Sequence, residues 1–189
     1  ASDVYKRQVI LILKRHYEYW FAAVALHKLG AVMIPATHML TVDDFVYRIN
    51  ASGVKAIVCT AQDDVPSTIK QALRKSEKTP VLWCVQKDVE GFFNLTSQME
   101  TAGDAFDRVE TSAADPMMLY FTSGTTGYPK GVIHDFTYPL AHIVTAKYWQ
   151  QAQDDGLHFT VAETGWAKAS WGKIYGPVSY THLRAHETR

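Results

Sequence analysis

A run of hydroxyl, glycine and lysine residues at positions 119–131, LYFTSGTTGYPKG, is the part of this sequence best suited to chemistry. Its hydroxyl and glycine residues are Thr122, Ser123, Gly124, Thr125, Thr126 and Gly127. Hydroxyl groups donate hydrogen bonds to phosphate oxygens, and glycine lets backbone amides turn inward without a Cβ clash. Lys130 adds a positive charge, and each charged hydrogen bond that it makes is worth roughly 1.5 to 3 kcal/mol. The run therefore predicts a loop that binds a polyphosphate.

The residues around Lys130 distinguish this loop from the Walker A pattern, G-x-x-x-x-G-K-[ST]. In that pattern a glycine precedes the lysine, and a hydroxyl residue follows it to hold magnesium. Here Pro129 precedes Lys130 and Gly131 follows it. The spacing disfavours an ordinary P-loop NTPase. A glycine- and threonine-rich turn without a ligand is the other alternative, and the ordered run that ends in Pro-Lys-Gly disfavours it.

Three stretches of the sequence resemble a known family. Residues 120–131 look like the signature loop of the adenylate-forming enzymes, a superfamily that includes acyl-CoA synthetases, luciferases and nonribosomal peptide adenylation domains. HDFTYP at 134–139 and FTVAETGW at 159–166 are similar to AMP-forming acyl-CoA synthetases of the acetyl and medium-chain type. The resemblance runs from about Val9 to Pro177. It implies an α/β fold with a mostly parallel sheet flanked by helices, as part of the large N-terminal domain of such an enzyme.

The resemblance also implies a reaction. The enzyme would activate a small carboxylic acid with ATP and Mg²⁺ to an acyl-adenylate, release pyrophosphate, and pass the acyl group to the thiol of coenzyme A. Residues 122–130 would hold the ATP phosphates, with Lys130 as the catalytic residue. Such chemistry depends on positioning and on charge compensation at the phosphates, so it needs no protein nucleophile. Ser123 is therefore not interpreted as one, and no metal site is assigned to side chains.

Two alternatives stay open at this point. Amino-acid adenylation domains and luciferase-like enzymes share the loop but hand the acyl group to another acceptor. The chain could also be a nucleotide-binding remnant without turnover. The stretches at 134–139 and 159–166 favour the CoA ligases.

By the same resemblance, Trp166, Ala167 and Lys168 lie near the acid substrate. The alternative is that Trp166 packs in the core, because a tryptophan side chain most often contributes buried apolar area. Glu163 stands where the family commonly has aspartate, and the longer reach of its carboxylate leaves its role open. The role of His134 is also open, since a single histidine in a domain is more often packed than catalytic.

The elements that must position these residues alternate between strand and helix, which is typical of a parallel sheet covered by helices. Strands are predicted at 9–13, 32–36, 55–60, 80–85 and 117–122, the last of which delivers the loop at its carboxyl end. Gly30 is predicted to end the first helix, and Thr41 with Asp44 is predicted to begin the second as a capping box.

The rest of the chain is less regular. Residues 86–115 are expected to form a surface excursion with a short helix near 96–101 and without function. A helix is predicted from Pro139, with Leu140, Ile143, Val144 and Tyr148 on its apolar face. A strand at 157–162 and a turn at 163–166 should follow.

Composition limits the function classes. The 189 residues include 19 Lys and Arg against 19 Asp and Glu, so the chain has no net positive charge that would attract nucleic acid or an anionic membrane. Cys59 and Cys84 lie in apolar runs and are expected to be buried, reduced thiols, which favours the cytoplasm. The sequence has no apolar run as long as a membrane span and no signal-peptide pattern.

The ends of the chain differ from its interior. Residues 1–8 and 178–189 are expected to be non-native, with residues 9–177 forming a partial AMP-binding domain and the C-terminal domain of the family absent. The chain alone should then be inactive or nearly so. The sequence does not indicate which acid is used or what the oligomeric state is.

Overall fold

The computed structural model describes residues 7–123, 127–153 and 156–187. Within them, seven strands form one sheet in the order β5-β4-β3-β1-β2-β6-β7. The strands are β1 Gln8–Ile12, β2 Val32–Pro35, β3 Ala56–Thr60, β4 Val81–Val85, β5 Phe93–Asn94, β6 Pro116–Thr122 and β7 Lys130–Asp135. All neighbouring pairs are parallel except β6 and β7, which form an antiparallel hairpin. The predicted α/β fold with a mostly parallel sheet is confirmed.

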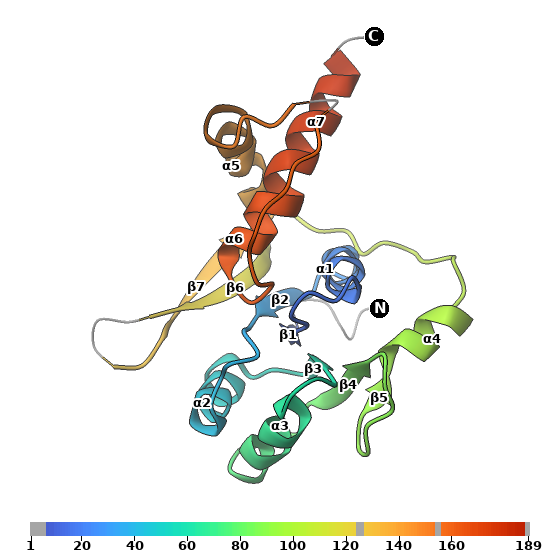
Figure 1. Cartoon of the computed structure of the whole chain (residues 1–189), viewed down its shortest axis with the longest axis vertical. Coiled ribbons are helices and arrows are strands. Elements are labelled where there is room, and N and C mark those ends of the chain that lie inside the picture. The colour runs from blue at the N-terminus through green and yellow to red at the C-terminus, as the bar shows by residue number, and fades with distance from the viewer. Residues whose placement is uncertain (1–6, 124–126, 154–155, 188–189) are drawn as a thin grey trace.

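Helices cover both faces of this sheet (Figure 1). They are α1 Glu18–Lys28, α2 Val42–Ser52, α3 Val65–Arg74, α4 Leu95–Thr101, α5 Tyr138–Val144, α6 Ala167–Ala169 and α7 Gly176–Glu187, with π-helical turns η1 Thr145–Trp149 and η2 Ser170–Tyr175. The helices α2 and α3 pack on one face, and α1 packs on the other together with residues of α5 and η2. No helix in the described part of the chain is long and apolar enough to cross a membrane.

The core has one apolar cluster on each face of the sheet. In β1, Leu11 faces the cluster with Tyr19 of α1, whereas Ile10 and Ile12 face the cluster with Phe45 of α2. All of these side chains are fully buried. Burial on both faces is the reason that this strand is a continuous apolar run instead of an alternating one.

Local sequence signals fix the ends of the early helices as predicted. The Thr41 side chain accepts a hydrogen bond from the Asp44 amide, and the Asp44 carboxylate accepts one from the Thr41 amide, which completes the capping box. Gly53 ends α2 with φ +61°, and Gly30 follows α1 with φ 65°. Both glycines thus adopt the left-handed conformation common after helix ends.

The strand predicted at 157–162 is wrong. These residues are irregular, and Leu157, Phe159 and Val161 are 100%, 83% and 72% exposed. Thr160 is buried instead, and its hydroxyl donates to the Gly172 carbonyl at 2.9 Å. A strand requires a partner for its backbone groups, and this segment has none among the described strands.

Two further differences concern the later part of the chain. The strands β5 and β7 were not predicted, the former because it has two residues and the latter because its exposed residues lack a clear alternation. The helix predicted from Pro139 is present as α5, but Leu140, Val144 and Tyr148 are 59%, 61% and 69% exposed, so its apolar face does not lie in the core.

Candidate functional site

The predicted phosphate loop joins the two strands of the β6–β7 hairpin. Thr122 at the end of β6 lies directly opposite Lys130 at the start of β7, and its hydroxyl donates to the Lys130 carbonyl at 3.4 Å. Directly opposite residues send their side chains to the same face of a hairpin. The Lys130 ammonium therefore leaves the same face as the Thr122 hydroxyl.

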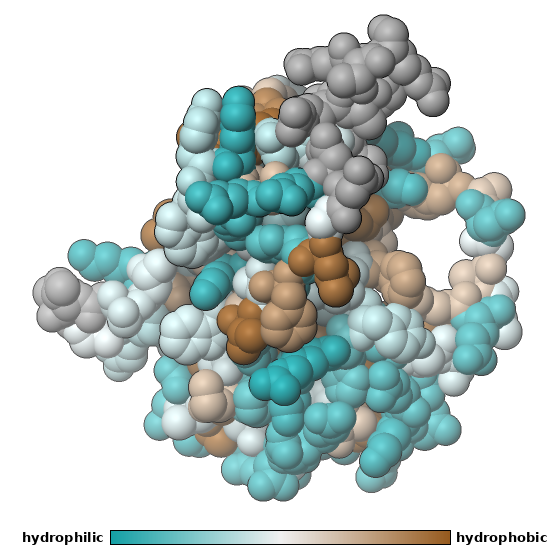
Figure 2. Space-filling view, turned by 45° about the horizontal axis from the view of Figure 1, so that its top comes forward, coloured by the Kyte–Doolittle hydropathy of each residue, from teal (hydrophilic) through white to brown (hydrophobic). Residues whose placement is uncertain are grey.

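The described part of this loop is open to solvent. Thr122, Ser123, Gly127 and Lys130 are all exposed. The predicted loop residues Gly124, Thr125 and Thr126 lie outside the described residues. Gly127 has φ 103°, a conformation that favours glycine. The strands that carry the loop extend away from the body of the molecule (Figures 1 and 2), so a ligand can approach it.

The far end of the loop is tied to α2. The Tyr47 hydroxyl donates to the Pro129 carbonyl at 2.8 Å, and the Tyr47 ring stacks on Tyr128 with centroids 5.0 Å apart. Tyr47 also meets the edge of Phe121 in β6. This contact spans 82 residues of sequence, and nothing near Tyr47 indicated it. Because α2 packs on the sheet, these contacts of Tyr47 fix the direction in which the loop leaves the molecule.

A pocket of about 370 Å³ lies beside the start of the loop. Its walls come from the end of β2 and the turn after it, from Arg48 of α2, from residues 120–123, and from residues 165–167. It therefore brings Thr122 and Ser123 of the predicted phosphate loop together with Trp166 and Ala167 of the predicted acid-binding segment. Lys130 and Lys168 do not line this pocket.

Arg48 is a pocket residue that the sequence analysis missed. Its Nη1 donates to the Asp44 carbonyl at 3.1 Å and pairs with the Asp44 carboxylate at 3.3 Å, and its guanidinium lies over the Phe121 ring at 5.4 Å. Burial opposes ionisation of Asp44, but hydrogen bonds from Thr41 and Arg48 outweigh it and lower the Asp44 pKa. The wall of the pocket thus contains a nearly buried guanidinium, which Asp44 of the same helix holds in place.

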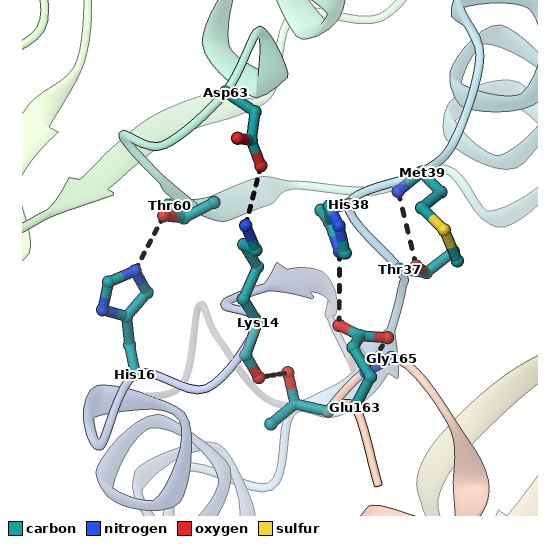
Figure 3. A network of polar contacts seen from close by, with 10 residues as sticks. Lys14, His16, Thr37, His38, Met39, Thr60, Asp63, Glu163 and Gly165 are labelled. Atoms are coloured by element: carbon teal, nitrogen blue, oxygen red, sulfur yellow. Dashed lines mark hydrogen bonds and ion pairs between the residues drawn. The ribbon is translucent and has the colours of Figure 1, made fainter.

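The turn at 163–166 is fastened to the ends of two strands (Figure 3). The Thr164 hydroxyl donates to the Lys14 carbonyl at 2.5 Å, just after β1. The Gly165 amide donates to Glu163 Oε2 at 3.0 Å, and Glu163 Oε1 lies 3.9 Å from His38 Nδ1. Burial raises the pKa of Glu163. The structure therefore places Glu163 at the base of the turn, where it holds the backbone that carries Trp166.

Gly165 packs tightly against the backbone just after β2. A Cβ atom on Gly165 would lie 2.3 Å from the Thr37 nitrogen and 2.4 Å from the Ala36 carbonyl carbon. Only glycine lets the two backbones meet at this distance. The contact sets Trp166, which is 60% exposed, at the mouth of the pocket instead of in the core.

A second pocket of about 560 Å³ lies on the other side of this turn. It is lined by Lys14, Arg15, His16, His38, Gln62 and Glu163. Much of its charge is internally paired, because Lys14 bonds Asp63 at 2.7 Å, and this hydrogen bond lowers the pKa of Asp63. His16 and the Thr60 hydroxyl share a hydrogen bond of 2.8 Å (Figure 3). These contacts brace the carboxyl ends of β1 and β3.

The structure places His134 and Trp171 in aromatic contacts outside the 370 Å³ pocket. His134 lies 4.4 Å from the Tyr138 ring, and its burial lowers its pKa. Trp171 stacks on His142 at 5.5 Å. Neither residue lines the pocket. Packing is the role that these contacts indicate for both side chains.

Comparison with solved structures shows the fold. A crystal structure of the Brucella canis acyl-CoA synthetase matches 93% of this chain and 32% of that protein, with a TM-score of 0.80 and 20% sequence identity. The luciferase-like enzyme from the mealworm Zophobas morio matches 96% of this chain and 42% of that protein, with a TM-score of 0.77 and 19% identity. At these identities the likeness concerns the fold alone.

Comparison with characterised sequences gives nearer relatives. The mitochondrial acyl-coenzyme A synthetase ACSM3 of Homo sapiens is 33% identical over 172 residues, which cover 90% of this chain and 29% of that protein. The mitochondrial acyl-coenzyme A synthetase ACSM4 of Mus musculus is 32% identical over 174 residues, with 89% and 29% covered. The chain thus spans less than a third of these relatives. The family model described as AMP-binding enzyme matches residues 3–178, nearly the whole chain, and the protein therefore belongs to the AMP-binding enzyme family.

Proposed function

We propose that this chain is part of an AMP-forming acyl-CoA synthetase. The enzyme would join a carboxylic acid to the α-phosphate of ATP, release pyrophosphate, and transfer the acyl group from the adenylate to the thiol of coenzyme A. One observation carries the proposal: a single pocket is lined both by the hydroxyl residues Thr122 and Ser123 and by Trp166 and Ala167. The similarity to the acyl-coenzyme A synthetases ACSM3 and ACSM4 supports coenzyme A as the acyl acceptor.

In the proposed site the ATP phosphates lie along the loop. Thr122, Ser123, Gly124, Thr125, Thr126 and Gly127 would supply hydroxyl and amide donors, and Lys130 would supply the charge. A carboxylate that attacks the α-phosphorus meets a group that is already anionic, so donors that compensate this charge lower the barrier. Lys130 suits this role because its ammonium is exposed on the same face as Thr122 and has a flexible stem.

The acid would occupy the part of the pocket formed by the turn. Trp166 and Ala167 line it, and Lys168 follows them at the start of α6. The Trp166 ring would cover apolar parts of the acid, and Gly165 and Glu163 would act indirectly by fixing the turn. Arg48, which also lines the pocket, would contribute positive potential without leaving Asp44.

Mg²⁺ enters the proposal as part of the substrate, bound to the phosphates of ATP. Among the described residues, no group of three or more histidine, cysteine, aspartate or glutamate side chains could hold a metal ion. Mg²⁺ characteristically keeps waters and binds through substrate phosphates, so the loop would meet the ion together with its phosphates.

The proposal includes the extent and location of the enzyme. Residues 9–177 would be part of the AMP-binding domain. The compartment would be the cytoplasm, which is supported by two free, buried cysteines in the structure. The names of the relatives place those proteins in mitochondria.

The test uses the uninterrupted enzyme that contains this sequence. Acid-dependent exchange of pyrophosphate into ATP reports the first step, and formation of acyl-CoA reports the second. Lys130→Ala should lower the exchange about 10² to 10³-fold, as loss of a charge-stabilising donor does in other enzymes. Lys147→Ala is the matched control, because Lys147 is an exposed lysine of η1 that does not line the pocket.

Three results would contradict parts of the proposal. Unchanged exchange in Lys130→Ala would remove this residue from its role. Exchange without acyl-CoA formation would indicate another adenylate-forming enzyme with a different acceptor. Measurable exchange by residues 9–177 alone would refute the expectation that this part has no activity.

A further inference from the structure

The chain contains two cysteines, and the structure puts them side by side. Cys59 of β3 and Cys84 of β4 are register partners in neighbouring parallel strands. Both side chains belong to the cluster beneath α2 and α3, and both are 0% exposed. They lie 25 positions apart in sequence, so their pairing is a consequence of the sheet and not of a local motif.

The ionisation of each thiol depends on the other. Interaction with the Cys84 side chain raises the pKa of Cys59, as does burial. Interaction with Cys59 lowers the pKa of Cys84 against the effect of burial, and the Val85 backbone adds to the lowering. Cys84 is thus the more acidic partner, and the thiolate is the reactive form of cysteine.

The spacing of the strands suits a covalent bond. Neighbouring strands lie about 4.7 to 4.9 Å apart. The Cα atoms of disulfide-bonded cysteines are usually about 4.4 to 6.8 Å apart. Because Cys59 and Cys84 are directly paired, a bond between them requires no sliding of β3 along β4 and no change of register.

We propose that Cys59 and Cys84 form an oxidation site in which a peroxide converts the buried thiol pair to an interstrand disulfide within the folded chain. The Cys84 thiolate attacks one peroxide oxygen, the O–O bond breaks, and hydroxide leaves and takes up a proton to become water. The resulting Cys84 sulfenic acid is attacked by the Cys59 sulfur, which forms the S–S bond and releases a second water. Two thiols are oxidised, and one peroxide is reduced to two waters.

Cys84 lies beside the edge strand of the sheet. The outer neighbour of β4 is β5, which has two residues and pairs through Trp83 with Phe93 and Cys84 with Asn94. The oxidant would enter by local opening of this short edge strand, with the rest of the sheet still paired. The site is independent of the proposed ligase reaction, because it lies at β3 and β4 and the 370 Å³ pocket lies at the ends of β2 and β6.

The test treats the reduced 189-residue chain with hydrogen peroxide under native conditions, with circular dichroism to follow its fold. Intact mass spectrometry should show loss of two hydrogen atoms, reversible by a dithiol reductant. Trypsin under non-reducing conditions should yield residues 56–70 joined to residues 79–87, which contain Cys59 and Cys84. Non-reducing gel electrophoresis should show monomers.

Two variants control the chemistry. Cys59→Ser leaves Cys84 without a partner thiol, and Cys84→Ser leaves Cys59. Both should gain oxygen atoms instead of losing hydrogen. The disulfide closes a loop of about 25 residues, which should raise the melting temperature of the oxidised wild type by about 10 °C.

The proposal fails if the wild-type thiols react only after the chain unfolds. It also fails if peroxide adds oxygen to the wild type without joining the two peptides, or joins them only between chains. A lower melting temperature after oxidation would contradict the fit of the bond to the folded sheet.

Discussion

Replacement of Gly165 by alanine tests whether the turn at 163–166 is held against β2. The added methyl group would meet Thr37 N at 2.3 Å, Ala36 C at 2.4 Å and Thr37 Cα at 2.5 Å. All three atoms belong to the backbone, so none can rotate aside as a flexible side chain would. One of the two segments must therefore move.

The size of the effect follows from what the movement costs. Insertion of a methyl group into a packed contact typically costs about 1 to 3 kcal/mol. If the turn detaches instead, it loses the hydrogen bonds from Thr164 to Lys14 and from Gly165 to Glu163, at about 0.5 to 1.5 kcal/mol each. Both routes give a loss of about 2 kcal/mol. The melting temperature of a chain of this size should fall by about 4 to 8 °C.

The assay has a global and a local readout. Urea unfolding measures the free energy of unfolding, and acrylamide quenching of Trp166 fluorescence, obtained by difference from Trp166→Phe in each background, reports detachment of the turn. Gly103→Ala is the matched control, because a Cβ atom there meets nothing within 4 Å. If Gly165→Ala matched this control in both readouts, the close approach of the turn to β2 would be refuted.

Two further predictions concern pH and the anchor of the loop. Burial lowers the pKa of His27 from 6.5 to about 4, so the unfolded chain takes up a proton between these values and the folded chain does not. The free energy of unfolding should fall by about 3 kcal/mol as the pH is lowered from about 6.5 to 4, and His27→Gln should remove this part of the pH dependence in urea titrations. Tyr47→Phe deletes the 2.8 Å hydrogen bond to Pro129, worth about 1 kcal/mol, so native-state trypsin cleavage after Lys130 should become about fivefold faster.

Each of these predictions has a contradicting result. Equal pH dependence of the wild type and His27→Gln would show that the His27 imidazole is protonated equally in the folded and unfolded states. An unchanged cleavage rate in Tyr47→Phe, equal to that of the exposed control Tyr148→Phe, would show that α2 does not restrain the loop.

Much of the parallel sheet could be predicted because its signals are local. Three signals could be read from neighbouring residues alone. They are the apolar run around Ile10, the capping pair Thr41 and Asp44, and Gly53 after α2. The loop at the end of β6 could be located for the same reason, because an apolar strand followed by hydroxyls, glycines and a lysine is a continuous pattern.

The features that shape the pocket could not be predicted, because they join distant segments. Tyr47 reaches Pro129 across 82 residues, and Gly165 packs against Thr37, which is far from it in sequence. In the sequence, Arg48 resembles an ordinary polar position of a helix. Its place in the pocket wall arises only on folding, which brings its guanidinium over the Phe121 ring. The segment at 157–162 alternates like a strand, yet its partner groups come from η2 and not from another strand.

The most direct test of the phosphate-loop assignment is a residue-resolved titration of this chain by nuclear magnetic resonance. MgATP and adenosine, which lacks phosphates, are compared by the shifts of the backbone amides. The assignment predicts that MgATP moves the signals of Thr122, Ser123, Gly127 and Lys130 and that adenosine leaves them in place. If these four amides stay unmoved at saturating MgATP, or if MgATP shifts only residues remote from the hairpin, the loop does not bind the nucleotide phosphates.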